Sequence, residues 1–199
     1  MMSVARFWFL VSALVLGAVA CFALMGCAQV IRLSTDLGQC GGVLLDKSSV
    51  LTSAHCASLP AWAGCDDDGA AVASWQTHPR YHESAEYDLA LGTLRRPVSC
   101  SVSEGAVAEG PLWWGSHPVD VENMPGVLVL DAAPEQFCVG NSGEPVLDSD
   151  GRVVALVSGW WLSKNSCSYH VHATLLAPDW PVGWPKLSKR QPGEDEDDG

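Results

Sequence analysis

Three short motifs contain side chains that could together cleave an acyl bond. They hold His55 in the segment LTSAHC, Asp88 in YDLAL and Ser142 in GNSGEP. A serine hydroxyl is a poor nucleophile near neutral pH, so His55 would accept its proton and later return it to the leaving group. Asp88 would hold the imidazole in the useful tautomer and stabilise its charged form. These residue types predict nucleophilic catalysis, provided that the fold brings them together.

The elements that must position these residues are predicted to be strands. Apolar and β-branched runs recur between turn signals, several alternate with period two, and none keeps a helical period. An all-β barrel or sandwich is therefore expected. The segment DSDG at 148–151 is typical of a hairpin turn, because its Asp-Gly pair tolerates positive φ. The predicted strands lie at 42–45, 49–52, 71–75, 89–94, 126–130 and 152–158.

Composition and charge restrict the class of protein. The chain has 199 residues, 48% of them hydrophobic and 17% charged, which is typical of a globular domain. Its net charge of −12 argues against nucleic acid or anionic lipid as a principal partner, since both require a basic surface. We expect a linker at 27–37, one compact domain at 38–185 and a disordered acidic tail at 186–199.

The N-terminal residues 1–26 are predicted to be a signal or lipoprotein leader or a membrane anchor. Arg6 precedes an uncharged run at 7–25 that could nearly span a bilayer, and Gly26-Cys27 follows. Three outcomes remain open: lipidation of Cys27, cleavage after Ala28, and an uncut anchor. Each places the domain outside the cytoplasm, and the leader or lipid would be its contact with the membrane.

The cysteines favour disulfides over metal binding. The chain has eight, and setting aside Cys21 and Cys27 in the leader leaves an even number in an exported chain. Their spacing does not match a zinc knuckle, so no metal or other cofactor is expected. The run Asp66-Asp67-Asp68 is expected to be a solvated turn, with a calcium loop as the alternative.

The segments CGGVLL (40–45) with LTSAHC, HPRY (78–81) with YDLAL, and CVGNSGEP (138–145) occur in the order His, Asp, Ser. Together they resemble the chymotrypsin/trypsin-like serine proteases across most of residues 38–180. The resemblance implies two packed antiparallel β-barrels with the catalytic cleft between them. It also implies a serine endopeptidase that cleaves polypeptides through an acyl-enzyme. The stretch between Asp88 and Ser142 is short for the family, so a shortened second barrel is expected.

The resemblance also assigns roles to the nucleophile loop and to the cysteines. The backbone N–H groups of Gly140 and Ser142 would form the oxyanion hole, worth about 3 kcal/mol per donor in comparable sites. Gly140 suits this role because it lacks a Cβ. Family pairs correspond to Cys40–Cys56 and Cys138–Cys167. Elimination pairs Cys65 with Cys100, which have no family counterpart, and two free thiols are the alternative.

Two residues of the loop depart from the family pattern. Asn141 stands where digestive members carry an aspartate that binds a new N-terminal ammonium, and an uncharged amide cannot make that ion pair. Activation by cleavage is therefore not expected, and the sequence GNSG resembles the bacterial glutamyl endopeptidases and HtrA-type proteases. Glu144 follows Gly143 where a small residue is usual, so its carboxylate needs an outward orientation or a partner.

Substrate contacts are assigned by the same resemblance. Gln136 would lie at the base of the specificity pocket, beside Phe137, and without an acid there a preference for Lys or Arg is not expected. Ser158 and Gly159 would align the substrate backbone. His170 and His172 share a strand face. Ordinary strand positions are favoured for these two histidines over a role in a pocket for acidic residues.

Two further functions are compatible with these motifs. One is a binding module on a protease fold, in which Glu144 and the shortened loops have abolished turnover. The other is a hydrolase acting on esters, because the same three residues can cleave them.

Overall fold

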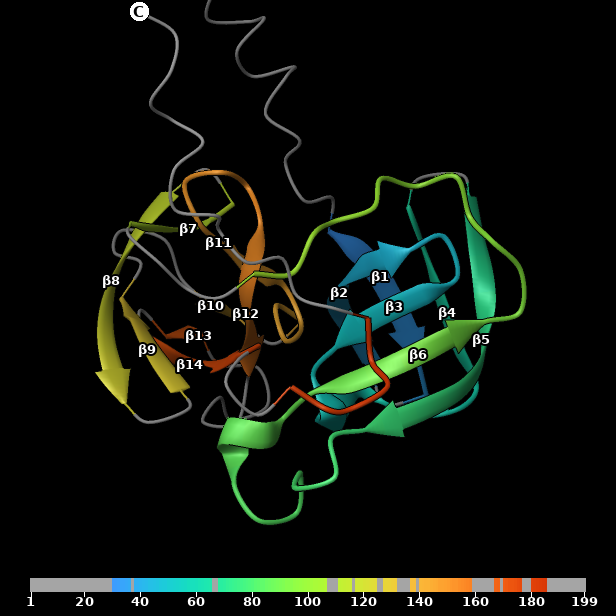
Figure 1. The fold of residues 1–199 in the computed structure, drawn as a ribbon, viewed down its shortest axis with the longest axis horizontal. Coiled ribbons are helices and arrows are strands. Elements are labelled where there is room, and N and C mark those ends of the chain that lie inside the picture. Colours follow the sequence, from blue (N-terminus) through green and yellow to red (C-terminus); the bar gives the residue numbers. More distant parts are fainter. Residues whose placement is uncertain are drawn as a thin grey trace, which may run out of the picture.

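The molecule consists of two β-barrels that lie side by side (Figure 1). Their arrangement comes from a computed structural model. The structure describes residues 30–36, 38–65, 68–106, 111–115, 117–124, 127–131, 137–138, 140–158, 167–168, 170–176 and 180–185.

The first barrel closes from six antiparallel strands in the order β1-β2-β3-β6-β5-β4. Two short 3-10 helices, η1 (Ala54–Cys56) and η2 (Ala85–Tyr87), follow β3 and β5. Closure leaves no free sheet edge. The strands are β1 (Ile31–Thr35), β2 (Gly38–Asp46), β3 (Ser49–Thr52), β4 (Ala61–Cys65), β5 (Asp68–Thr77) and β6 (Ala90–Leu94).

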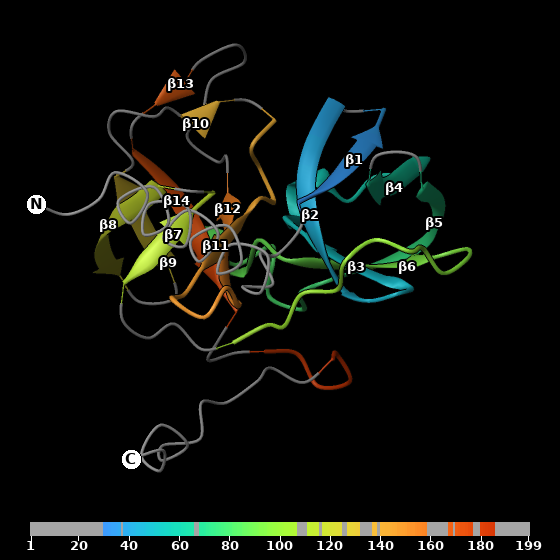
Figure 2. The same cartoon turned by 90° about the horizontal axis from the view of Figure 1, so that it is seen from above.

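The second barrel also closes from six antiparallel strands, in the order β11-β12-β14-β9-β8-β7. A separate pair, β10 (Phe137–Cys138) with β13 (Cys167–Ser168), lies to one side of this barrel (Figure 2). The all-β fold with two packed barrels is thereby confirmed. The barrel strands are β7 (Leu112–Trp114), β8 (His117–Met124), β9 (Val127–Asp131), β11 (Pro145–Leu147), β12 (Val153–Ser158) and β14 (His170–Leu175).

The linker predicted at 27–37 is wrong for residues 31–35, which form β1. Ile31 and Leu33 are fully buried while Arg32 between them is exposed, the alternation expected of a strand with one face on the core. The strand pairs with both β2 and β4 and so completes the first barrel. The folded domain therefore begins before residue 38.

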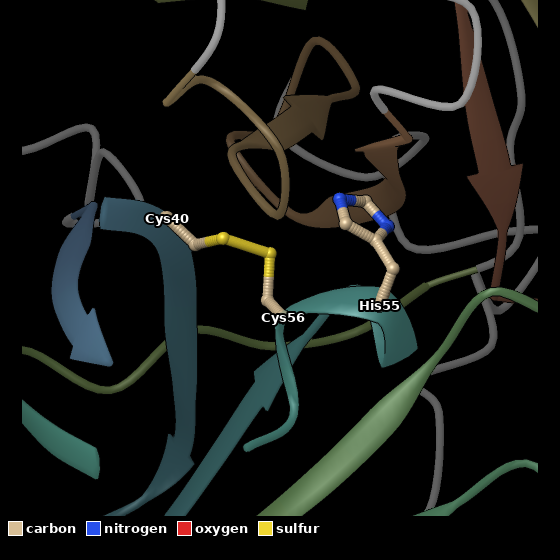
Figure 3. A group of neighbouring side chains, drawn as sticks. All are labelled: Cys40, His55 and Cys56. Carbon is tan, nitrogen blue, oxygen red and sulfur yellow. A yellow bond between two sulfur atoms is a disulfide. The ribbon is translucent and has the colours of Figure 1, made fainter. Parts of the chain in front are cut away.

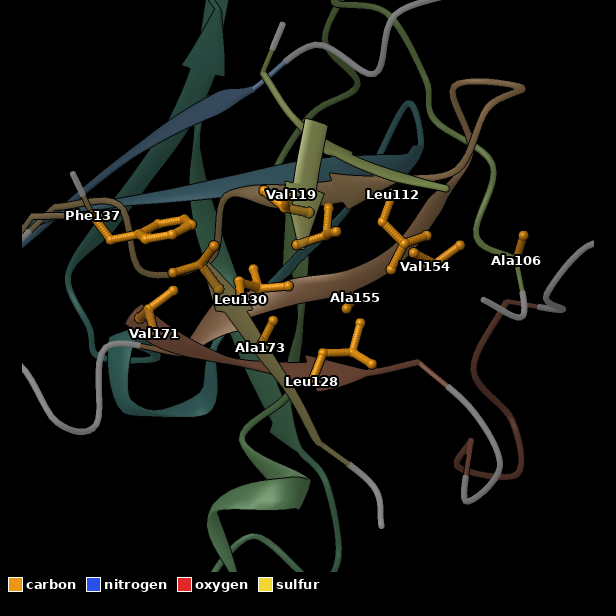
Figure 4. Close-up of a cluster of buried hydrophobic side chains, with 12 residues drawn as sticks. Ala106, Leu112, Val119, Leu128, Leu130, Phe137, Val154, Ala155, Val171 and Ala173 are labelled. Carbon is orange, nitrogen blue, oxygen red and sulfur yellow. The ribbon is translucent and has the colours of Figure 1, made fainter. Parts of the chain in front are cut away.

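A hydrophobic cluster fills the second barrel (Figure 4). Phe137, Leu130 and Val154 are among its fully buried members. Each large side chain of this kind contributes about 1.5–3 kcal/mol when removed from water. A corresponding cluster, which includes Ile31 and Leu44, fills the first barrel.

A third cluster joins the two barrels. Val43 and Leu51 from the first barrel are buried together with Val153 and Leu156 from β12 and with Trp184 near the C-terminus. All six residues of β12 are buried: Val154, Ala155 and Val157 belong to the second barrel's cluster, and Val153 and Leu156 belong to the cluster that joins the barrels. The two barrels therefore share a common apolar interface, which fixes their relative placement.

The hairpin turn predicted at 148–151 joins β11 to β12. The Gly151 N–H donates to the Asp148 carbonyl at 3.1 Å, and Gly151 has φ of +78°. The Asp148 carboxylate also accepts the guanidinium of Arg152 at 2.8 Å. Asp-Gly chemistry thus produces the turn that the sequence predicts.

Within the described residues, no helix combines the length and the apolar character required to cross a membrane. The leader predicted at 1–26, Cys27 and the tail predicted at 186–199 lie outside the described residues.

Candidate active site

His55 lies on η1, directly after β3, and is anchored by a disulfide. The Cys40–Cys56 bridge connects β2 to η1, and Figure 3 shows the imidazole beside it. The bridge limits the movement of the histidine relative to β2. The His55 side chain is one-third exposed, so it can be reached from solvent.

The other two disulfide predictions are also confirmed. Cys138–Cys167 joins β10 to β13, and Cys65–Cys100 joins the end of β4 to the segment that leaves β6. Three disulfides are typical of a protein that folds outside the cytoplasm.

Asp88 is fully buried and binds His55 twice. Its Oδ2 lies 2.7 Å from His55 Nδ1, and its Oδ1 accepts the His55 backbone N–H at 2.9 Å. The Ser158 hydroxyl donates to Oδ2 at 2.6 Å. Three donors satisfy a carboxylate that would be costly to bury unpaired. A neutral imidazole has one N–H group and one acceptor nitrogen. Because Nδ1–H donates to the carboxylate, Nε2 is left as the nitrogen that can accept a proton.

Ser158 has a role that the sequence did not predict. It was expected to align substrate through its backbone, yet its hydroxyl is turned inward onto Asp88 and the residue is only 1% exposed. Because Ser158 belongs to β12 and Asp88 precedes β6, this bond also crosses between the barrels.

Ser142 lies in a loop that is hydrogen-bonded to both barrels. The Gly41 N–H of β2 donates to the Ser142 carbonyl at 2.7 Å, and the Gly143 N–H donates to the Val157 carbonyl of β12 at 2.7 Å. Gly143 is thus bonded to the residue that directly precedes Ser158, the hydrogen-bond donor to Asp88. His55 and Ser142 are both described, and no hydrogen bond joins their side chains here; such contacts tighten when substrate binds.

Two glycines permit the loop conformation. Gly140 has φ of +108° and Gly143 has φ of +84°, in the region that side-chain-bearing residues rarely adopt. A Cβ on Gly143 would collide with the Gly41 carbonyl and with the Thr52 hydroxyl. Any larger residue at Gly143 would therefore move the nucleophile loop away from β2.

Glu144 has the partners that its position requires. Its Oε2 accepts the indole N–H of Trp114 at 2.9 Å, and its Oε1 accepts the side-chain amide of Asn141 at 2.9 Å. The residue is half-buried, and both carboxylate oxygens accept a hydrogen bond from a side chain. Glu144 is therefore not a free charge next to the nucleophile.

An open cavity of about 530 Å³ lies next to the nucleophile loop. Residues of β1 and β2 line one side, and Gly140 with Glu144 lines the other. The space next to the expected oxyanion hole is thus accessible to a ligand. Its lining residues are Val30, Arg32, Gln39, Cys40, Gly41, Cys65, Gly140 and Glu144.

The expected substrate pocket is only partly described. Gln136 and Gly159 lie outside the described residues. The assignment of Phe137 is wrong for its side chain, which is fully buried in the second barrel's core against Trp114. The ring is large and apolar, so its burial in the core is favoured. His172 on β14 is partly buried, and burial lowers its pKa below the usual value.

The donor set beside His55 does not fit a metal ion. Donor atoms of Cys40, His55 and Cys56 lie within 4.8 Å of one another, but the two sulfur atoms form a disulfide and cannot act as thiolate ligands. At the acidic run, the Asp68 carboxylate is bonded to the Ser99 backbone and hydroxyl and to Arg96. Asp66 and Asp67 lie outside the described residues.

These features define a class of protein. Residues 27–119, just under half of the chain, match the trypsin family. The fold is the two-barrel fold of the chymotrypsin/trypsin-like serine proteases, so the chain is similar to that family in its fold and over these residues. The narrower resemblance to bacterial branches of the family stays a prediction.

Particular relatives are similar over different extents. Human kallikrein-10 is 38% identical over 77 residues, which cover 30% of this chain and 28% of the kallikrein. Neuropsin, a serine protease expressed in the limbic system of mouse brain, superposes with a TM-score of 0.60 at 18% identity, covering 76% of this chain and 90% of neuropsin. The scabies mite inactivated protease paralogue S-D1 superposes with a TM-score of 0.59 at 13% identity, covering 76% and 91%. The chain thus matches less than a third of its curated relative's length, and at these identities the structures establish the fold alone.

Proposed function

We propose that this protein is a serine endopeptidase in which His55, Asp88 and Ser142 form the catalytic triad. The observation that carries the proposal is the buried Asp88 carboxylate, which receives three hydrogen bonds and lies 2.7 Å from His55 Nδ1. A carboxylate in this arrangement orients the imidazole and stabilises its protonated form. In support of the proposal, the loop that carries Ser142 is bonded to both barrels, and its partner Val157 directly precedes Ser158, which binds Asp88.

The proposed reaction has two halves. His55 Nε2 takes the Ser142 proton as Oγ attacks the substrate carbonyl, and the N–H groups of Gly140 and Ser142 donate to the oxyanion that forms. The imidazolium, stabilised by Asp88, then protonates the leaving amine as the C–N bond breaks. Water attacks the resulting ester of Ser142 with His55 again acting as base, and the acid product leaves with the serine restored.

We further propose export of the domain, with Cys27 lipidated, the leader cleaved or the leader retained as an anchor. The six cysteines paired in three bridges support an oxidising location. Because Gln136 replaces an acid at the expected pocket base, the enzyme is expected not to prefer Lys or Arg in its substrates.

Reaction with a fluorophosphonate probe tests the nucleophile. The purified ectodomain should be labelled, because the probe requires a serine activated by a histidine. Ser142→Ala should abolish labelling, and Asp88→Asn should slow it by about 10⁴-fold, since the imidazole would then be held in the wrong tautomer. The labelled fraction is measured by intact-protein mass spectrometry.

A correctly folded wild type that is not labelled would support the alternative, a non-catalytic binding module. The residue that raises this alternative is Glu144, which follows Gly143 where a small residue is usual in the family. If labelling occurs, hydrolysis of a peptide library compared with that of simple esters separates an endopeptidase from an ester hydrolase.

A further inference from the structure

A chain of three hydrogen bonds connects the nucleophile loop, residues 138–144, to Trp114. The Trp114 indole N–H donates to Glu144 Oε2 at 2.9 Å, and Asn141 Nδ2 donates to Glu144 Oε1 at 2.9 Å. The Cys138 backbone N–H then donates to Asn141 Oδ1 at 2.6 Å. We call these residues the Trp114–Glu144–Asn141 relay.

The polarity of the relay permits only one orientation of the Asn141 amide. A carboxylate accepts hydrogen bonds and donates none, so Glu144 must face the NH₂ group of Asn141. The amide oxygen is thereby directed at the Cys138 N–H, which begins the turn closed by the Asn141 N–H on the Cys138 carbonyl at 3.0 Å. Glu144 thus determines the orientation of the turn that contains Gly140.

Rigid structure surrounds both ends of the relay. Trp114 is on β7, pairs with Val146 of β11, and packs on the buried Phe137 ring with centroids 4.1 Å apart. At the other end, Cys138 is bridged to Cys167. A Cβ on Gly41 would lie 2.6 Å from Glu144 Cγ, so the first barrel also packs closely on Glu144.

We propose that Glu144, held by Trp114, is a positioning residue that orients Asn141 and thereby the Gly140 and Ser142 N–H groups for oxyanion stabilisation. The inference rests on the proposed function and concerns how that site is kept competent. Here a side-chain network inside the second barrel replaces the ion pair with a new N-terminus that digestive members of the family use. The loop is therefore organised without proteolytic activation.

The relay is tested by exchanging the amide of Asn141 and the carboxylate of Glu144. Each single substitution breaks a hydrogen bond of the relay, and the two together restore it with donor and acceptor reversed. Asn141→Asp places two carboxylates against each other, and kcat should fall by about 100-fold with KM nearly unchanged. Glu144→Gln turns one NH₂ group toward another, and kcat should fall by about tenfold. In the double variant the introduced amide accepts from Trp114 and donates to the introduced carboxylate, which still accepts from Cys138. Its kcat should recover to within about fivefold of wild type.

Hydrogen exchange provides a readout that does not depend on turnover. Trp114→Phe keeps an aromatic ring against Phe137 but removes the indole donor, so amides at 138–144 should exchange faster. Trp113→Phe is the matched control, because Trp113 is the neighbouring residue and is 36% exposed. It should leave exchange at 138–144 and kcat unchanged. Melting temperatures within a few degrees of wild type would show that each variant is folded.

The outcomes separate this inference from the proposed function. A wild type that does not react with fluorophosphonate overturns the proposed function. A reactive wild type whose double variant is as slow as Asn141→Asp, or whose Trp114→Phe variant behaves like Trp113→Phe, overturns the inference. Recovery in the double variant, with protected amides at 138–144, supports it.

Discussion

The Asp88 carboxylate combines a proposed catalytic role with a structural one. Of the three hydrogen bonds it accepts, two come from the side chain and the backbone of His55, and one comes from Ser158 in the other barrel. The His55 bonds orient the imidazole, and the Ser158 bond links the two barrels at the site. Because all three bonds meet at the group that orients the imidazole, loss of a donor to Asp88 should lower turnover.

Ser158→Ala should lower kcat about tenfold by removing a charged hydrogen bond to Asp88, with a smaller effect on KM. Ser53→Ala is the matched control, because its buried hydroxyl donates to the Val157 carbonyl at 2.9 Å and does not bind Asp88. This control should cost about 1 kcal/mol of stability and leave kcat nearly unchanged. Steady-state kinetics and urea unfolding of both variants measure the difference; equal kcat values would contradict the role assigned to Ser158.

At the level of elements, an ion pair and hydrogen bonds connect the start of β5 to the segment that follows β6 in the first barrel. Asp68 at the start of β5 accepts the Ser99 backbone N–H at 2.5 Å and its hydroxyl at 2.7 Å, and it pairs with Arg96. These contacts, the Ser99 backbone bond foremost, lower the pKa of Asp68 from 3.8 to about 2. Together with the nearby Cys65–Cys100 bridge, they hold the segment after β6 against β5.

The lowered pKa of Asp68 predicts a pH-dependent contribution to stability. Because its folded pKa lies below the unfolded value, the contribution is complete above about pH 4 and is lost as the pH falls toward about 2. Asp68→Asn should therefore lower the melting temperature at pH 7, and this effect should become much smaller as the pH falls to about 2. Calorimetry across this range tests the prediction, and a difference that does not vary with pH would contradict it.

A strand could be predicted from the sequence where its apolar residues form a clear run between turn signals. β3 was predicted at 49–52 as observed, because its apolar side chains lie between clear turn signals. β8 (HPVDVENM) was missed, since polar residues interrupt it and no uniform apolar run marks it. Residues 31–35 are predicted to be part of a linker, yet they form β1, in which Ile31 and Leu33 alternate with polar residues.

The site was predictable to a similar, limited extent. Motif order and chemistry were enough to single out His55 and Asp88, which the fold brings into contact. The hydrogen-bond partner Trp114 of Glu144 was not predictable from the sequence. Trp114 lies on β7, far from Glu144 along the chain, and only folding of the second barrel brings the two residues together. The hydroxyl of Ser158 likewise requires both barrels to be in place.

At the level of the whole molecule, the C-terminal residues 180–185 pack on the cluster that joins the barrels. Trp184 is 5% exposed, belongs to this cluster and meets the Trp180 ring edge-on at a centroid distance of 5.1 Å. Its buried indole nitrogen has no hydrogen-bond partner among the residues that the structure describes. The apolar surface of Trp184, and not its N–H group, therefore stabilises the joined barrels.

Trp184→Ala should cost about 3–5 kcal/mol, because it opens a cavity in the shared cluster. Trp184→Phe keeps most of the ring and removes the unpaired N–H group, so it should cost less than about 1.5 kcal/mol. Chemical denaturation of both variants measures these values. Similar losses in the two variants would indicate that the indole N–H contributes after all.

The strand β2 serves both halves of the proposed chemistry. Cys40 is bridged to Cys56, the residue after His55, and Gly41 donates its N–H to the Ser142 carbonyl. Base and nucleophile are thus both located from two consecutive residues of one strand. The separation between His55 and Ser142 therefore depends on the conformation of β2 as well as on the packing of the two barrels.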